Sequence, residues 1–108
     1  MNALATIPAQ VSEEAAQYIE RMGLQEPFQR MLKEIPKRIQ AIHWIEVGLE
    51  HIVDEANRPV VVIHVARVYP GRDDPSGRDF GAWETETFPP EICEHLGVHV
   101  TYVDAYAR

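Results

Sequence analysis

The sequence predicts an α+β fold, in which an N-terminal αα-hairpin packs on a small, mainly antiparallel sheet of three strands, or four if a further segment joins it. Two observations predict this class. Apolar residues recur at helical spacing up to residue 35, and from residue 39 the spacing changes to alternation at period two. A further helical segment then precedes a last β-branched run. The expected order is α-α-β-β-α-β, with the helices on one face of the sheet.

The first predicted helix lies between Ser12, a good N-cap, and Gly23, which supplies the left-handed end. Its apolar residues are Ala15, Ile19 and Met22, at positions i, i+4 and i+7. The second helix begins near Glu26 and Pro27 and ends at Pro36. Its apolar residues are Phe28, Met31, Leu32 and Ile35. Two short helices joined by a tight turn form an αα-hairpin with one apolar face.

The next segment is expected to form a β-hairpin. Residues 39–53 alternate between an apolar and a mixed face, residues 54–59 are rich in turn formers, and residues 60–69 are rich in β-branched side chains. If the turn is centred near residue 56, Leu49 faces Ile63 and His64 lies opposite Gly48.

The C-terminal part is expected to add a short helix and a strand. Pro89 and Pro90 begin the helix at residues 91–96, and Gly97 ends it. The last strand covers residues 98–106. It can pair parallel with the second strand through a right-handed crossover, or antiparallel with the first, and we favour the antiparallel arrangement.

Residues 70–88 are predicted to form a long loop, which is longer than most structureless connections in compact domains. We expect residues 71–77 to be mobile. The segment from Phe80 to Phe88 is expected to be anchored on the domain or on a partner, and a short extra strand could form through residues 82–88. Phe80 and Trp83 are therefore candidate interface residues.

Composition limits the classes of function. The net charge of −7 disfavours nucleic acid and anionic membranes as partners, since both require positive counter-charge. Cys93 is the single cysteine, so no internal disulfide can form, and the N-terminus lacks the pattern of a signal peptide. We expect one domain over residues 1–108, with residues 1–11 flexible, in a protein of the cytoplasm.

One cluster on the mixed face of the hairpin could carry chemistry. The predicted register places Glu46 and Glu50 diagonally beside His64, so that the three side chains could hold a metal or form an acid/base pair. A bulge at Gly48 would separate them. The structural alternative is a solvated sheet face with a histidine–glutamate pair, because alternation alone produces such a set. No metal site and no cofactor is predicted.

The same mixed face offers a contact surface. Ile42 and Trp44 lie on it in the predicted pattern, and Tyr102 and Tyr106 alternate in step on the last strand. An uncovered aromatic patch is typical of protein interfaces, and dimerisation is a common way to protect sheet edges.

Two functions follow from these patterns. The first is a small acidic, non-enzymatic interaction or regulatory module, most simply a homodimer, that binds another protein or a second copy of itself. The alternative is a small metal-dependent or acid/base enzyme, or a ligand-binding domain, that uses His64, Glu46 and Glu50.

Overall fold

A computed structural model describes residues 9–51, 58–68 and 76–103 and shows an α+β fold. Two N-terminal helices precede a four-stranded mixed sheet, and further helices precede its last strand. The elements, in chain order, are β1 (Ala9–Val11), α1 (Glu13–Met22), α2 (Gln25–Arg38), β2 (Ile42–His51), β3 (Pro59–Val68), α3 (Ser76–Thr87), α4 (Pro90–Cys93) and β4 (Leu96–Val103).

The sheet has the strand order β1-β2-β3-β4. The central β2–β3 pair is antiparallel, as the hairpin pattern predicted, whereas β1–β2 and β3–β4 are parallel. The predicted antiparallel pairing of the last strand with the first was therefore wrong. Because β3 and β4 are parallel, the chain must cross over between them. The segment that contains α3 and α4 forms this crossover connection.

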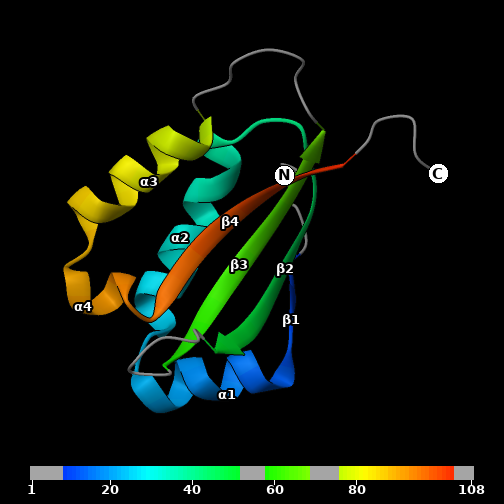
Figure 1. Cartoon of the computed structure of the whole chain (residues 1–108). Coiled ribbons are helices and arrows are strands. Elements are labelled where there is room, and N and C mark those ends of the chain that lie inside the picture. The colour runs from blue at the N-terminus through cyan, green and yellow to red at the C-terminus, as the bar shows by residue number, and fades with distance from the viewer. Residues whose placement is uncertain (1–8, 52–57, 69–75, 104–108) are drawn as a thin grey trace, which may run out of the picture.

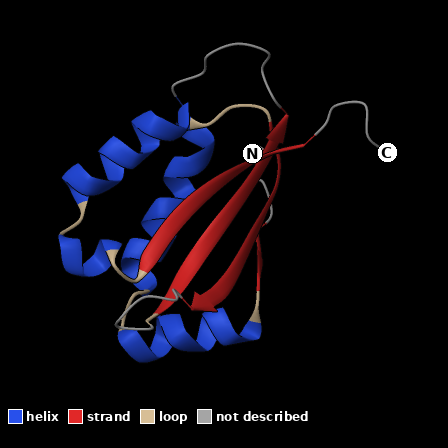
Figure 2. Ribbon diagram, in the orientation of Figure 1, coloured by secondary structure: helices blue, strands red, loops and turns tan. Residues whose placement is uncertain are grey.

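The helices pack against one face of the sheet and leave the other uncovered (Figure 1). In this view β4 passes in front of α2, and α1 lies below the strands. Figure 2 shows the same separation of helical and strand layers. The buried apolar residues come from both layers: Ala15, Tyr18, Ile19, Leu24, Phe28, Met31, Ile35, Ile39, Ile45, Val47, Val61, Ile63, Val65, Phe80, Phe88 and Leu96.

The first helix has the predicted bounds and caps. The Ser12 hydroxyl accepts a hydrogen bond from the Ala15 amide, and Gly23 adopts φ +67°, which only glycine adopts freely. Its buried stripe differs at one end, because Tyr18 is buried and Met22 is 44% exposed. Tyr18 instead reaches the C-terminal part of the chain, where its hydroxyl lies 2.8 Å from Nδ1 of His95.

The second helix continues past Pro36 to Arg38, so the predicted end at Pro36 was wrong. A proline removes one N–H donor, and here the loss falls within three residues of the helix end. The ladder closes normally beyond it, because the Ile39 amide donates to the Ile35 carbonyl over 2.8 Å.

The segment predicted as a long loop contains α3. The extra strand proposed for residues 82–88 was therefore wrong, whereas the anchoring of its aromatic residues on the domain is confirmed. Phe80 and Phe88 are buried in the core, and Trp83 packs against it. Residues 69–75, which include most of the segment predicted to be mobile, lie outside the described residues, and residues 9–11 of the predicted flexible N-terminus form β1.

Basic side chains of α2 hold α3 in place. The guanidinium of Arg38 lies 5.3 Å from the centre of the Trp83 ring, and that of Arg30 lies 5.6 Å from the Phe88 ring. Arg38 also bonds Glu34 within α2, at 2.6 Å. Arg30 and Arg38 therefore link α2 to Trp83 of α3 and to Phe88, which directly follows α3.

Candidate functional site

The uncovered side of the sheet, which we call the open face, carries the candidate site. It consists of the side chains that alternate away from the helices on all four strands. Cross-strand pairs share a face, so the register identifies its members: Gln10, Trp44, Glu46, Gly48, Glu50, Val60, Val62, His64, Ala66, Gly97, His99 and Thr101.

One polar row crosses every strand of this face. Gln10 on β1 pairs with Glu46 on β2, Glu46 pairs with His64 on β3, and His64 pairs with His99 on β4. The rings of His64 and His99 stand edge to face, with their centres 5.7 Å apart. Gln10 joins the row because β1 pairs with β2, and His99 joins it because β4 pairs with β3. Sequence alternation within single strands could not reveal these pairings.

The hairpin register differs by two residues from the predicted one. Gly48 pairs with Val62 and His64 with Glu46, rather than His64 with Gly48. A shift of two preserves the face of every side chain, so Glu46, Glu50 and His64 still share the open face as predicted. No bulge occurs at Gly48; the irregularity lies between Ile42 and Trp44.

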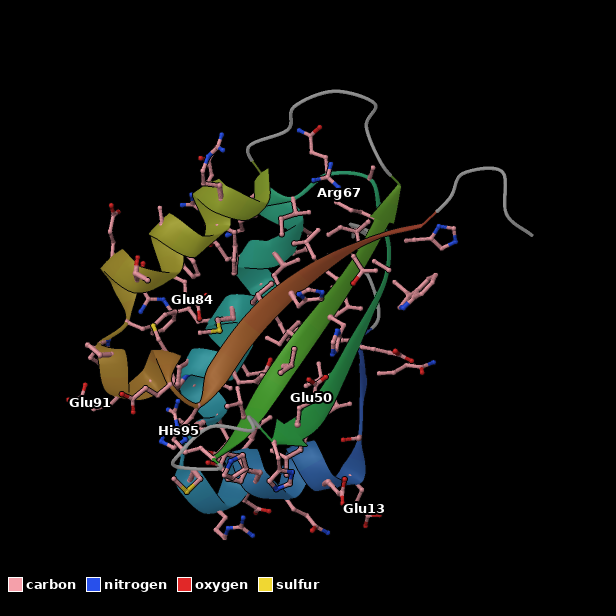
Figure 3. The ribbon with its side chains drawn as sticks, viewed as in Figure 1. Glu13, Glu50, Arg67, Glu84, Glu91 and His95 are labelled. Carbon is pink, nitrogen blue, oxygen red and sulfur yellow. The ribbon has the colours of Figure 1, made fainter. Side chains whose placement is uncertain are left out.

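Glu50 and His64 form the closest polar contact of the face. Oε2 of Glu50 lies 2.6 Å from Nε2 of His64, and the imidazole N–H donates to the carboxylate. Glu50 reaches diagonally over the row of Gly48 and Val62, and Figure 3 shows it in front of the sheet. The side chains remain 51% and 34% exposed, respectively, so the pair is solvated and contributes little to stability.

A glycine row adjoins the polar row. Gly48 on β2 and Gly97 on β4 both pair with Val62 on β3, and a Cβ atom built on either glycine meets nothing within 4 Å. Neither glycine adopts positive φ, so backbone conformation does not require them. The missing side chains leave the face hollow between the flanking rows.

Two adjoining depressions lie over β1 and β2. One, of about 440 Å³, is lined on the open face by Gln10, Glu46, Gly48, Glu50 and His64. The other, of about 330 Å³, is lined by Gln10, His43, Trp44, Ile45 and Glu46. Gln10 and Glu46 line both, so the two depressions form one shallow surface along the strands.

Trp44 and Ile42 do not share a face. The register shift pairs Ile42 with Arg67 on the helix side, where Ile42 packs against the core, whereas Trp44 pairs with Ala66 on the open face and is 42% exposed. A bulge inverts the alternation that the sequence pattern assumed.

The remaining predicted interface residues are dispersed. Phe80 and Trp83 belong to the core and its margin on α3, away from the open face. Tyr102 lies on β4, where its backbone pairs with that of Arg67, and Tyr106 lies outside the described residues.

A second group of ionisable side chains lies between α3 and α4. Glu84 is only 9% exposed, and burial raises its pKa to about 7. Burial, and then the charge of Glu84, raise the pKa of the half-buried Cys93 thiol. A thiol shifted in this direction is a weak nucleophile, so this pair does not resemble a cysteine catalytic site.

The described residues contain no group of three or more His, Cys, Asp or Glu side chains placed to hold a metal ion. No helix in the described ranges has both the length and the apolar character needed to cross a bilayer. Comparisons with known proteins give no matching family, no similar curated protein and no similar solved structure.

Proposed function

We propose that this chain is a small cytoplasmic protein-interaction module that acts without catalysis and contacts another protein through its open face. One observation carries the proposal. The sheet is covered by helices on one side only, and Trp44 stays 42% exposed beside a hollow on the other side. Exposed tryptophans next to depressions are typical of the few residues that dominate binding energy at interfaces.

The experiment places a photo-crosslinker at this point. Trp44 is replaced by benzoylphenylalanine, and the full chain is expressed in the cells that normally produce it. The control carries the same group at Gln17, an exposed residue of α1 that is not part of the open face. We expect a discrete crosslinked adduct only from position 44. Equal labelling from both positions, or none from position 44, would contradict the proposal.

The module is also proposed to be a homodimer, joined along β4. This edge strand is eight residues long, and its sequence LGVHVTYV contains no proline and no charged residue. The opposite edge strand, β1, has three residues in the part of the chain that the structure describes. Natural sheets prevent pairing at their edges with short edge strands, charged side chains or proline. An edge strand that has none of these features is suited to pairing with another strand.

The Glu50–His64 pair supports a second candidate, an acid/base or ligand-binding site. A carboxylate that orients an imidazole is a common arrangement in general-base catalysis. Calorimetric titration with Zn²⁺ tests the metal-dependent form: heat that is lost in His64→Ala and retained in His51→Ala favours this candidate. Absence of heat removes its metal-dependent form.

A further inference from the structure

The open face carries two carboxylates and two histidines, His64 and His99, but no lysine or arginine among the described residues. Glu46 and Glu50 are both exposed on it. The described lysines and arginines lie elsewhere. Arg21 is on α1, Arg78 is on α3, Arg67 is buried on the helix side, and Arg58 precedes β3 and lies 3.8 Å from Glu94. The others are on α2: Arg30, Lys33, Lys37 and Arg38.

Trp44 and Glu46 stand next to each other on this face. They are two residues apart on β2, so their side chains project from the same side of the sheet, about 7 Å apart at the backbone. An arginine that stacks on an indole and pairs with a neighbouring carboxylate gains from cation–π and ionic attraction together. The arrangement is chemically complementary to a cationic side chain.

The glycine row provides room for a second main chain. A glycine in the middle of a strand weakens the strand, and it commonly marks a place where a ligand or another backbone approaches closely. Gly48 lines the larger depression between Glu46 and Glu50, and a Cβ atom built on it meets nothing within 4 Å. An extended segment can therefore approach the sheet between the two carboxylates.

A second copy of the chain is a poor occupant of this face. Two stacked open faces would bring together the same carboxylates on two molecules that each carry a net charge of −7. Such like-charge contact opposes association, whereas a basic segment gains from the same field.

From this charge complementarity we infer that the open face binds an extended, arginine- or lysine-rich segment of a partner protein. A cation stacks on Trp44 and others pair with Glu46 and Glu50, while the segment's main chain passes over Gly48. The inference rests on the proposed interaction function and specifies the chemistry of its partner.

The test uses synthetic peptides and the full ¹⁵N-labelled chain. The probe is an octapeptide of alternating arginine and threonine, whose alternation places all its cations on one side when extended. Matched octapeptides contain glutamine or glutamate in place of arginine, and spermine serves as a cation without a peptide chain. Amide and indole chemical shifts report both the affinity and the place of binding.

We expect the arginine peptide to shift the Trp44 indole and the amides of Gln10, Glu46 and Gly48, and the glutamine and glutamate peptides to shift none. Glu46→Gln should weaken binding about two- to fivefold, the range for one exposed ion pair. Glu86→Gln, the same charge change on the exposed side of α3, should leave affinity unchanged. Gly48→Val should abolish binding and leave the remaining spectrum in place, since its side chain enters empty space.

Other outcomes overturn the inference in distinguishable ways. If the glutamine peptide binds at the same residues with equal affinity, the open face is a docking surface for a different chemistry, and only the cationic partner is excluded. Spermine binding as tightly as the peptide excludes a protein segment. If no peptide shifts the face while position 44 still crosslinks in cells, the interaction function stands and the basic partner does not.

Discussion

At the scale of single residues, Glu84 is the clearest exception to the usual pattern, because it is a glutamate buried in the folded chain. The residue is 9% exposed, and burial raises the pKa of its carboxyl from 4.5 to about 7. Folding therefore favours the protonated acid. Ionisation of Glu84 opposes the docked position of α3 against the rest of the domain.

We predict that Glu84→Gln removes a pH dependence of stability. Between about pH 4.5 and 7 the folded chain keeps a proton that the unfolded chain has lost, so the free energy of unfolding falls as pH rises and levels off above pH 7. After allowance for partial solvation, this loss is about 1–2 kcal/mol. The amide cannot ionise, so the variant should be more stable than the parent by that amount at pH 8 and similar to it at pH 4.

Urea unfolding at pH 4, 6 and 8 measures this difference. Glu86→Gln is the matched control, because Glu86 is an exposed glutamate on the same helix and its substitution should leave the slope with pH unchanged. The same pH slope in Glu84→Gln and in the parent chain would show that another group is responsible.

At the scale of elements, α3 is a helix that tertiary contacts stabilise. Its sequence contains Gly77 and Gly81 and a threonine at each of two positions near its end, all weak helix formers, which is why the segment resembled a loop. The spacing of Phe80 and Trp83, three residues apart, is the sequence feature that indicates a helix here. Both side chains pack against the core, and Trp83 also contacts Arg38 of α2. Their packing compensates for low propensity.

We predict that α3 opens before the β2–β3 core does, and that Phe80→Ala lowers its opening free energy by about 3 kcal/mol, as expected for removal of a buried phenyl ring. Native-state hydrogen exchange measures this: the amides of α3 should lose protection more than those of residues 60–66. Thr85→Ala is the control on the same helix, since its hydroxyl bonds only to carbonyls within α3. An equal loss of protection in helix and sheet would contradict separate opening.

The elements with strong local signals were predictable from the sequence, and their arrangement in the sheet was only partly so. The caps Ser12 and Gly23 fixed α1, and alternation fixed the open face of the hairpin, including Glu46 and His64. Three features depend on contacts between distant segments and leave little trace in local patterns. They are the parallel pairing of β1 with β2 and of β4 with β3, the bulge beside Trp44, and the burial of Glu84. The sequence therefore predicted the members of the candidate site on β2 and β3, but not those on β1 and β4.

At the scale of the whole molecule, the direction of the β4 edge determines what a dimer would present. The Val61 amide donates to the His95 carbonyl, so odd-numbered residues of β4 direct their backbone groups toward β3. The N–H and C=O groups of Val98 and Val100 therefore point outward along the free edge. Two copies related by a two-fold axis normal to the sheet pair these edges antiparallel.

Such a dimer forms one continuous sheet, and the two-fold axis normal to it keeps both open faces on the same side. A partner with two basic segments could then bind both faces, and the second contact would be intramolecular. Avidity of this kind raises apparent affinity by orders of magnitude without any new contact. The homodimer and the acidic open face are thus compatible, because they use the edge and the face of the sheet separately.

We predict that the chain is a dimer in sedimentation equilibrium and that the double variant His99→Lys, Thr101→Lys is a monomer. Both side chains are exposed on β4, so the substitutions spare the core, and edge lysines repel across an antiparallel pair. The control is Thr85→Lys, which adds a lysine at an exposed position of α3 and should leave the dimer intact. If the parent chain sediments at its monomer mass of 12.3 kDa even at its highest soluble concentration, the edge is not an interface. If the double variant stays dimeric, the second copy binds elsewhere. The arginine peptide then shows whether that second copy covers the open face, because a dimer built on this face would lose its affinity for the peptide as the protein concentration rises.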